Sequence, residues 1–257
     1  MSGWLKIVGL GPGAARMITP EVSAALLEAS DVVGYVPYVN RVAPREGLIR
    51  HGSDNREEIN RAEQALQLAF EGHRVAVVSS GDPGVFAMAS AVFEALEAGD
   101  PRWRSIDIQV LPGISAMLAA SARAGAPLGH DFCCINLSDN LKPWSLIEKR
   151  LRLSAEADFA MAFYNPRSQA RPIGFERTLK VLREVCEPER LIIFARAVST
   201  PDESIRVTTL AEATPEMADM RTLVIVGSSQ TRRIERMKSS GADEHKAPLV
   251  YTPRSVC

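Results

Sequence analysis

Residues 8–19 read "VGLGPGAARMIT", in which three glycines at alternate positions follow a short apolar run. A short apolar run is typical of a buried strand, and glycines at its end predict a tight turn. Thr19 before Pro20 predicts the N-cap and the first residue of a helix. The stretch therefore predicts a strand, a glycine turn and a helix in succession, which is the repeating unit of an α/β sheet.

The same alternation continues along the first half of the chain. It predicts strands at 4–10, 31–36, 74–80 and 106–111, and helices at 20–28, about 56–71, about 85–98 and from about residue 115. Strands that alternate with helices in this way usually pair in parallel, so we expect a mostly parallel sheet here.

The second half of the chain has more strands than helices. It predicts strands at 131–137, 158–164, 190–198, 204–210 and 221–227, and helices at about 143–153 and 172–186. The strand at 204–210 alternates polar and apolar residues close behind its neighbour, so we expect a mixed sheet. The tail after Arg232 is polar and lacks periodicity, and we expect it to be loosely held.

A change of composition separates the two halves. Small residues, two glycines and a proline interrupt the pattern at 122–131, "ARAGAPLGHD". Such residues favour a hinge. We therefore expect two α/β domains, at residues 1–122 and 123–257, with a mostly parallel sheet in the first and a mixed sheet in the second.

Composition limits the class of protein. The chain has 257 residues, of which 46% are hydrophobic and 24% charged, as is typical of a soluble globular protein. Its 30 basic and 31 acidic residues nearly cancel, so the chain has no overall positive potential that would attract a polyanion. We therefore expect no nucleic-acid partner. No apolar run approaches the roughly 18 residues of a membrane span, and no signal peptide precedes the first strand, so we expect a cytoplasmic protein without a membrane partner.

The cysteines predict no metal site. Cys133, Cys134, Cys186 and Cys257 include no CxxC pair. The adjacent Cys133 and Cys134 would point to opposite faces of a strand, so we interpret the cysteines as reduced structural thiols.

The glycine turn could in principle bind a nucleotide phosphate, because residues 9–14 satisfy the loose pattern GxGxxG/A. Three features argue against it. Asp31 opens the second strand instead of ending it, the first helix starts only after Thr19, and Pro12 removes an N–H from the turn. The Walker pattern GxxxxGK[ST] is absent. We therefore do not expect dinucleotide binding.

Similar turns follow other strands: "SSGDPGVFAM" (79–88), "LPGISAM" (111–117), "FYNPRS" (163–168) and "IVGSSQT" (225–231). Turns at the carboxyl ends of parallel strands line the ligand crevice of an open α/β sheet. Three such turns in the first half indicate a ligand recognised mainly by main-chain groups. The alternative is that each is only a tight connection between a strand and a helix.

Taken together, GLGPG with a threonine before the first helix, SSGDPGVF, PGISA and YNPRS, in this order and spacing, resemble the tetrapyrrole methylases over about residues 4–230. Residues 32–42, 129–151 and 162–168 resemble the branch that methylates carbon 17 of precorrin-3B and contracts the ring. The resemblance implies S-adenosylmethionine as cofactor, a tetrapyrrole substrate, a ligand trough between the two domains and a homodimer.

The resemblance also implies site residues. The cofactor-binding residues would be Pro12, Ser80, Gly81, Asp82, Val85, Ser115, Ala116, Tyr164, Asn165 and Ala197. Residues 195–196, Thr222 and Leu223 match a looser motif. Asp82 could accept from a ribose hydroxyl, lie near the sulfonium or cap the next helix.

The implied substrate carries carboxylates, so basic residues beside the motifs are expected to bind it. The candidates are Arg41, Arg45, Lys142, Arg167 and Arg171, and the alternative for each is a solvated charge. The implied ring contraction needs a base, for which His130 and Asp131 are the candidates, and the alternative is a structural hinge.

Three aromatic residues could stack on a macrocycle or fill the core. We expect Phe86 in the core and leave both roles open for Tyr35 and Tyr38. Methyl transfer from a sulfonium needs no metal and little acid–base assistance, which agrees with a sequence without a catalytic triad.

Other functions stay open at this point. The substrate could be the cobalt complex of the anaerobic route, or the chain could be a non-catalytic tetrapyrrole or nucleotide sensor with the same fold. It could also methylate protein or RNA, although its nearly neutral charge argues against RNA.

Overall fold

The computed structural model describes residues 3–54, 57–236 and 247–255. The chain divides into two compact units, residues 1–116 (unit 1) and 117–257 (unit 2). This division lies earlier than the boundary expected after residue 122, because helix α5 (Ala116–Ala124) is bound to unit 2. Its Arg123 forms an ion pair with Glu203, and Met117 N donates to Tyr164 Oη at 3.1 Å. The trough expected between the domains stays a prediction.

Unit 1 is built on a five-stranded sheet in the order β3-β2-β4-β1-β5, and all neighbouring strands are parallel, as expected. The strands are β1 (Trp4–Gly9), β2 (Asp31–Tyr35), β3 (Ile49–Ser53), β4 (Arg74–Ser79) and β5 (Asp107–Leu111). The glycine turns therefore leave the sheet at one edge, which we call the carboxyl edge of unit 1.

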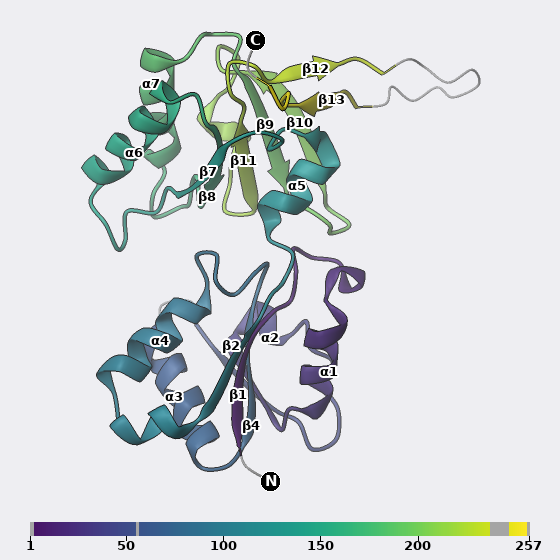
Figure 1. Cartoon of the computed structure of the whole chain (residues 1–257), viewed down its shortest axis with the longest axis vertical. Helices are drawn as coiled ribbons and strands as arrows, with labels where there is room; N and C mark the ends of the chain where they lie inside the picture. Colours follow the sequence, from purple (N-terminus) through teal and green to yellow (C-terminus); the bar gives the residue numbers. More distant parts are fainter. Residues whose placement is uncertain (1–2, 55–56, 237–246, 256–257) are drawn as a thin grey trace, which may run out of the picture. The chain divides into compact units, whose positions relative to one another are not determined.

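Helices cover both faces of this sheet, with α3 and α4 on one side and α1 and α2 on the other (Figure 1). The helical segments are η1 (Ala15–Met17), α1 (Pro20–Glu28), α2 (Val36–Val39), α3 (Glu58–Phe70), α4 (Met88–Ala98) and η2 (Pro101–Ser105). Leu5 and Ile7 of β1 pack in the α3–α4 core, and Val8 packs in the α1 core. Burial on both faces explains why β1 reads as one apolar run.

Thr19 caps α1 as expected, because Val22 N donates to Thr19 Oγ1 at 3.2 Å.

Strand β3 was not expected. Its residues are exposed or half-buried and it pairs with β2 alone, so no apolar run marks it. Helix α4 starts at Met88, three residues later than expected, since Phe86 has a positive φ of 53° that ends the preceding turn.

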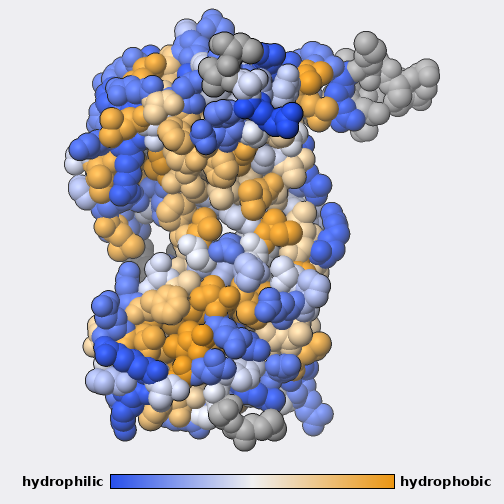
Figure 2. Space-filling model, in the orientation of Figure 1, coloured by the Kyte–Doolittle hydropathy of each residue, from blue (hydrophilic) through white to orange (hydrophobic). Residues whose placement is uncertain are grey.

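Some apolar side chains of unit 1 stay on the surface. Phe86 is 50% exposed, so the expectation that it fills the core is wrong. Phe93 of α4 and Val110 of the edge strand β5 are also exposed. Figure 2 shows a hydrophobic area on the visible face of unit 1.

Unit 2 is built on a mixed five-stranded sheet in the order β10-β9-β11-β8-β7, as expected. Strands β7 and β8 are parallel, and the other neighbours are antiparallel. The strands are β7 (Phe132–Asn136), β8 (Ala160–Tyr164), β9 (Leu191–Arg196), β10 (Ser204–Thr209) and β11 (Thr222–Val226).

Helices α6 (Trp144–Glu156) and α7 (Gly174–Val185) lie together on one side of the unit 2 sheet (Figure 1), and a short helical turn, η3 (Pro215–Met217), precedes β11. Leu151 of α6, Phe175 of α7 and Phe163 of β8 belong to one buried core. Both helices begin where β7 and β8 end, at the edge that we call the Asn165 edge, since each follows one of these strands.

A small third sheet corrects the expectation of a loosely held tail. Strands β12 (Arg232–Ile234) and β13 (Leu249–Tyr251) are antiparallel, and β13 pairs in parallel with β6 (Gly125–Ala126). The expectation is wrong for these segments, because main-chain pairing holds both strands and Val250 of β13 is fully buried. Residues 237–246, to which it also applied, lie outside the described residues.

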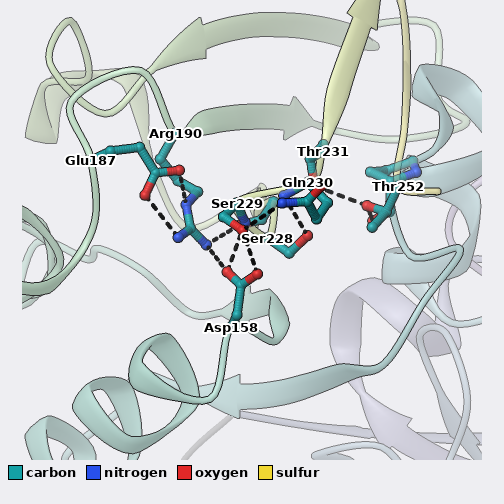
Figure 3. A network of polar contacts seen from close by, with 10 residues as sticks. Asp158, Glu187, Arg190, Ser228, Ser229, Gln230, Thr231 and Thr252 are labelled. Carbon is teal, nitrogen blue, oxygen red and sulfur yellow. Dashed lines mark hydrogen bonds and ion pairs between the residues drawn. The ribbon is translucent and has the colours of Figure 1, made fainter. Parts of the chain in front are cut away.

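A polar network stabilises the edge of unit 2 opposite the Asn165 edge (Figure 3). Arg190, 5% exposed, bonds to Glu187 and donates to Asp158 Oδ1 at 2.9 Å. Asp158 also accepts from Ser229 N at 2.7 Å and Ser229 Oγ at 2.6 Å. These residues join the start of β8, the start of β9 and the end of β11.

Candidate active site

Three glycine turns meet through their main chains at the carboxyl edge of unit 1. Gly11 N donates to Gly81 O at 3.2 Å, and Gly81 N donates to Gly11 O at 2.9 Å. A Cβ on Gly9 would lie 2.5 Å from Gly81 O, and one on Gly113 would lie 2.2 Å from the same atom. The turns after β1, β4 and β5 therefore pack so closely that Gly9 and Gly113 leave no room for a side chain.

Asp82 joins two of these turns. Its Oδ1 accepts from Gly84 N at 2.8 Å, and its Oδ2 accepts from Gly113 N at 3.0 Å. It does not cap α4, because the N-cap there is Ala87 and no side chain bonds as a cap. Of the alternatives for Asp82, the helix cap is excluded, and the observed bonds give it a positioning role at the edge.

The other unit 1 candidates lie in or directly beside the same turns. Pro12, Ser80 and Val85 are half-buried, and Ser115 is buried. A Cβ on Gly81 would lie no closer than 3.7 Å to its neighbours, the nearest being Ser115 Cα. The second turn therefore lies at ordinary van der Waals distance from the third.

Arg41 supports the first turn. Its Nη1 donates to Gly11 O at 3.2 Å, and its Nη2 donates to Gly13 O at 3.3 Å and to the carbonyl oxygen of Leu10. Burial lowers the pKa of the Arg41 guanidinium. Its donors are directed to the protein main chain, and this favours a positioning role over contact with substrate carboxylates.

Arg45 does not lie beside the glycine turns of unit 1, and its assignment to substrate binding stays a prediction. Its guanidinium donates to Leu26 O at 3.3 Å and to the carbonyl oxygen of Ala29. These carbonyls end helix α1, which starts at the carboxyl edge and runs back to the opposite edge of the sheet. A cation there stabilises the helix C-terminus.

Tyr35 and Tyr38 form a T-shaped pair at the end of β2, with ring centroids 5.3 Å apart. Both are half-buried, and burial raises the pKa of the Tyr38 hydroxyl.

Asp31 lies at the opposite end of β2, fully buried against His51 and His73 at 2.8 Å each. The argument that Asp31 stands at the wrong end of the strand for a ribose contact is therefore confirmed.

Sequence reasoning missed Arg61, which is 3% exposed near the carboxyl edge. Its Nε donates to Ser53 Oγ at 2.9 Å, its Nη2 to Asp54 O at 2.5 Å and its Nη1 to Met88 Sδ at 3.3 Å. It thus connects the end of β3 to the start of α4, and burial lowers the pKa of its guanidinium. The available signal was its position on the buried stripe of α3, four residues before Ala65.

The unit 2 candidates for cofactor binding gather at the Asn165 edge. Asn165 has a φ of 54°, and its Nδ2 donates to Asn136 Oδ1 at 3.1 Å. Tyr164 ends β8 beside it. Ala197 follows β9 with a φ of 50°, and Thr222 of β11 pairs with Arg196 at the same edge. The ends of four strands therefore bring these residues together.

The turn after β9 also carries an unsatisfied hydroxyl. Ser199 has a φ of 65° and is 7% exposed, and its Oγ finds no hydrogen-bond partner among residues 3–54, 57–236 and 247–255. Positive φ at Ala197 and Ser199 costs about 1 kcal/mol each. A buried, unpaired hydroxyl in a strained turn fits a polar ligand that would satisfy it.

Three of the basic candidates do lie at the Asn165 edge. Lys142 Nζ donates to Ser138 O at 3.0 Å, Arg171 Nη1 donates to Asn165 O at 3.4 Å, and Arg167 Nη1 donates to Pro215 O at 3.4 Å. Burial, followed by the charges of Arg150 and Arg171, lowers the pKa of the Lys142 ammonium. Sequence reasoning did not single out Arg150.

His130 and Asp131 do not join these residues. They precede β7, whereas Asn136 at the other end of β7 is paired with Tyr164. A strand of this length separates its ends by roughly 15 Å. The two side chains contact each other at 3.5 Å, and Asp131 is 79% exposed. His130 and Asp131 therefore lie away from the Asn165 edge, and their role as the base of the ring contraction stays a prediction.

The cysteines have the properties of structural thiols. Cys133, Cys134 and Cys186 are free, and burial raises the pKa of Cys134 to about 12. Cys257 lies outside the described residues. Within the described part of the chain, no group of three or more His, Cys, Asp or Glu could hold a metal ion, and no helix is long and apolar enough to cross a membrane.

Comparison with known proteins adds to this geometry. The family model for tetrapyrrole (corrin/porphyrin) methylases matches residues 5–214. A "Precorrin-3B C(17)-methyltransferase" from Sinorhizobium sp is 51% identical over 99% of this chain and 97% of its own. The crystal structure of the methyltransferase CobJ has 63% sequence identity and a TM-score of 0.92, and the match covers 98% of this chain and 100% of that one.

A more distant structure shares the fold. Uroporphyrin-III C-methyl transferase from Thermus thermophilus, complexed with S-adenosyl homocysteine, has 21% identity and a TM-score of 0.67 over 88% of this chain and 92% of its own. The family model and the 51% identical relative both extend over most of the sequence. The chain belongs to the tetrapyrrole (corrin/porphyrin) methylases.

Proposed function

We propose that this chain transfers a methyl group from S-adenosylmethionine to carbon 17 of precorrin-3B, with contraction of the ring to precorrin-4, in cobalamin biosynthesis. The methyl donor of the family is S-adenosylmethionine. The name of the Sinorhizobium relative supports the choice of substrate and carbon atom.

The observation that carries the proposal is the meeting of three turns at the carboxyl edge of unit 1. Asp82 and the Gly11–Gly81 pair hold the turns together, and main-chain groups line the edge. An edge of this kind is where open α/β sheets bind their ligands. Pro12, Ser80, Gly81, Asp82, Val85, Ser115 and Ala116 are the residues proposed to hold the cofactor in unit 1.

Unit 2 is proposed to contribute Tyr164, Asn165 and Ala197 to cofactor binding. The positive φ at Ala197 supports this assignment because such residues cluster at functional sites. The unsatisfied Ser199 Oγ also supports it, because a bound polar molecule would give that hydroxyl a partner. Arg167, Lys142 and Arg171 are proposed to face the substrate.

S-adenosylmethionine supplies a methyl group that its sulfonium already activates. The residues of this chain then have to bind the reactants, orient the nucleophilic carbon in line with the methyl group and exclude water. Rigid turns suit this task, because a displacement of about 1 Å would cost much of the rate.

The direct test is anaerobic incubation of the purified chain with S-adenosylmethionine and precorrin-3B, with cobalt-precorrin-3 in parallel. Mass spectrometry and NMR would identify the new methyl carbon. Methylation at carbon 17 of the cobalt-free ring is the expected result. Methylation at another carbon would contradict the proposed site of reaction, and transfer to the cobalt complex alone would favour the anaerobic substrate.

Binding of S-adenosylhomocysteine, measured by calorimetry, tests the cofactor separately. Saturable binding without methyl transfer to either macrocycle would favour a sensor. Absence of binding would contradict the cofactor assignment itself.

A homodimer and a cytoplasmic location are also proposed, from the resemblance to the family. The exposed apolar area on the visible face of unit 1 (Figure 2) supports assembly, because such areas commonly mark interaction surfaces. Light scattering should give twice the mass of one chain, and cell fractionation should find the protein in the cytoplasmic fraction. A monomer at micromolar concentration would contradict the dimer.

A further inference from the structure

The connection between β9 and β10 holds two residues other than glycine at positive φ. Ala197 has a φ of 50° and Ser199 a φ of 65°. We call residues 197–203 the β9–β10 turn. Residues other than glycine avoid this conformation, so it persists only where surrounding contacts stabilise it. Thr200 supplies one such contact, since its N and Oγ1 donate to Ala197 O at 3.1 and 2.8 Å.

Glu203, at the end of the turn, supplies the contact for Ser199. Its Oε2 accepts from Ser199 N at 2.5 Å, and its own N donates to Thr200 O at 3.1 Å. Arg123 in the last turn of α5 holds this carboxylate, with its Nε 3.0 Å from Oε1 and 3.1 Å from Oε2. The Glu203 side chain is therefore fixed from two sides, by the main chain of its own turn and by a helix that precedes the sheet of unit 2.

The conformation fixed in this way buries a hydroxyl without giving it a partner. Ser199 is 7% exposed, and in the described part of the chain its Oγ is the one buried side-chain oxygen or nitrogen that lacks a hydrogen bond. Burial of an unpaired hydroxyl lowers the stability of the free protein, and the positive φ of the same residue lowers it further. A bound ligand that hydrogen-bonds to Ser199 Oγ would remove the first of these two costs.

The charges around the turn indicate the kind of ligand group. Both acidic residues of the turn are paired, because Asp202 contacts Arg221 at 3.1 Å and Glu203 contacts Arg123. The hydroxyl of Ser199 is itself neutral and acts as donor or acceptor. The turn thus offers a ligand a neutral hydrogen bond, and this suits a neutral polar group better than a carboxylate.

We propose that Glu203 is a positioning residue, which holds Ser199 so that its hydroxyl forms a hydrogen bond to a neutral polar group of S-adenosylmethionine. The identity of the ligand rests on the proposed function, in which Ala197 of the same turn binds the cofactor. Glu203 acts through Ser199 N and does not touch the cofactor. Ser199 gains its partner only in the complex, so its hydroxyl contributes to affinity and not to the stability of the free chain.

The first test is calorimetric titration of full-length Ser199→Ala with S-adenosylhomocysteine. Affinity should fall about fivefold, because a neutral hydrogen bond to the ligand is lost. The melting temperature of the ligand-free variant should not fall, because the hydroxyl has no partner to lose in the free chain. A variant that binds as tightly as the wild type would overturn the proposal.

Glu203→Ala tests the positioning role against a matched control. It should weaken S-adenosylhomocysteine binding about tenfold, because Ser199 N loses its acceptor. Asp202→Ala removes the neighbouring carboxylate of the same turn, which is also paired with an arginine, and should change affinity by less than about twofold. Glu203→Gln keeps an oxygen that accepts from Ser199 N and should recover part of the affinity. Equal losses in Glu203→Ala and Asp202→Ala would overturn the positioning role.

A double variant shows whether the two residues act through one contact. With Ser199→Ala already present, Glu203→Ala should cost less affinity than it does in the wild type, and full additivity would contradict the proposal. If Glu203→Ala does not fold, Ser199→Ala and Glu203→Gln decide. A wild type that does not bind S-adenosylhomocysteine overturns the proposed function and this assignment together. Unchanged affinity of Ser199→Ala, beside a wild type that binds, overturns this assignment alone.

Discussion

The two candidate edges differ in the groups that form them, which are closely packed main chains in unit 1 and cationic side chains in unit 2. At the carboxyl edge of unit 1, glycines bring main chains into contact, and Arg41 donates to three main-chain carbonyls. At the Asn165 edge of unit 2, Lys142 and Arg171 each donate to a single main-chain carbonyl, and neither forms an ion pair with a carboxylate of the described residues. The first edge should therefore be sensitive to added atoms, and the second to lost charge.

The largest effect is expected for Gly113→Ala. The new Cβ would lie 2.2 Å from Gly81 O, a main-chain atom that cannot move without separating the turns. We expect a loss of about 3 kcal/mol in the free energy of unfolding and loss of S-adenosylhomocysteine binding. Urea unfolding and calorimetry measure the two effects.

Gly47→Ala is the control for this variant. Gly47 has a φ of 74°, but within the described chain no atom lies within 4 Å of an added Cβ. Gly47→Ala should lower the free energy of unfolding by about 1 kcal/mol, because alanine is strained at this positive φ. Its affinity for S-adenosylhomocysteine should stay unchanged. Equal effects of the two variants would contradict the close packing of the turns.

Asp31→Asn tests the edge of unit 1 that faces away from the glycine turns. The buried carboxylate accepts from Ser30 and contacts His51 and His73, and although burial alone would raise its pKa, these bonds hold the pKa below its usual value. We expect Asp31→Asn to lower the free energy of unfolding by about 2 kcal/mol at neutral pH. S-adenosylhomocysteine affinity should not change.

The sign of the pH dependence follows from the lowered pKa of Asp31. A carboxylate whose pKa is lower in the folded state stabilises the fold above its unfolded value of about 4, and loses this effect as pH falls through the folded value. The difference between wild type and Asp31→Asn should therefore shrink below about pH 4. If the difference in stability between the wild type and Asp31→Asn stayed constant as pH falls, the charge of Asp31 would not be the cause of that difference.

Arg41→Met tests whether the Arg41 guanidinium stabilises the first turn of unit 1. Because Arg41 donates to the carbonyls of the first turn, its loss should lower the free energy of unfolding by about 2 kcal/mol and weaken S-adenosylhomocysteine binding. Arg45→Met, at the end of α1, should cost less than about 1 kcal/mol and leave binding unchanged. Equal losses of stability and of binding in Arg41→Met and Arg45→Met would contradict a specific role of Arg41 at the first turn.

The smallest effect is expected for His130→Ala. His130 precedes β7 and lies far from the Asn165 edge, so turnover of precorrin-3B should stay within about twofold of the wild type. Product analysis should still find the contracted ring. A loss of contraction with methylation intact would restore His130 as the base and would show that a third region takes part.

Much of the fold could be predicted because burial leaves a local pattern. Strands β1 and β4 are covered on both faces and read as apolar runs, and the Thr19–Pro20 pair marks the start of α1 within a few residues. Strand β3 could not be predicted in this way, because pairing with β2 holds it while its side chains stay largely exposed. The same reason applies to β12, whose residues are all exposed.

The candidate site was predicted in part. The turns at 79–88 and 111–117 stand out by composition, but nothing near Asp82 in the sequence indicates that it accepts from Gly113 N. Arg61 was missed because its partners come from β3 and α4. His130 is close to Asn136 in sequence, yet the length of β7 places the two residues at opposite edges.

Local patterns in the sequence were enough to predict the family, the glycine turns and most of the helices and strands, because periodicity, caps and glycine patterns act between residues that are near one another in the chain. The three-dimensional contacts were needed to show the order of the strands, the edge at which each residue lies, and the partner of each cation. Those properties depend on contacts between segments far apart in sequence, such as Gly81 with Gly113 and Asn165 with Asn136. Local patterns carry no information about such pairs.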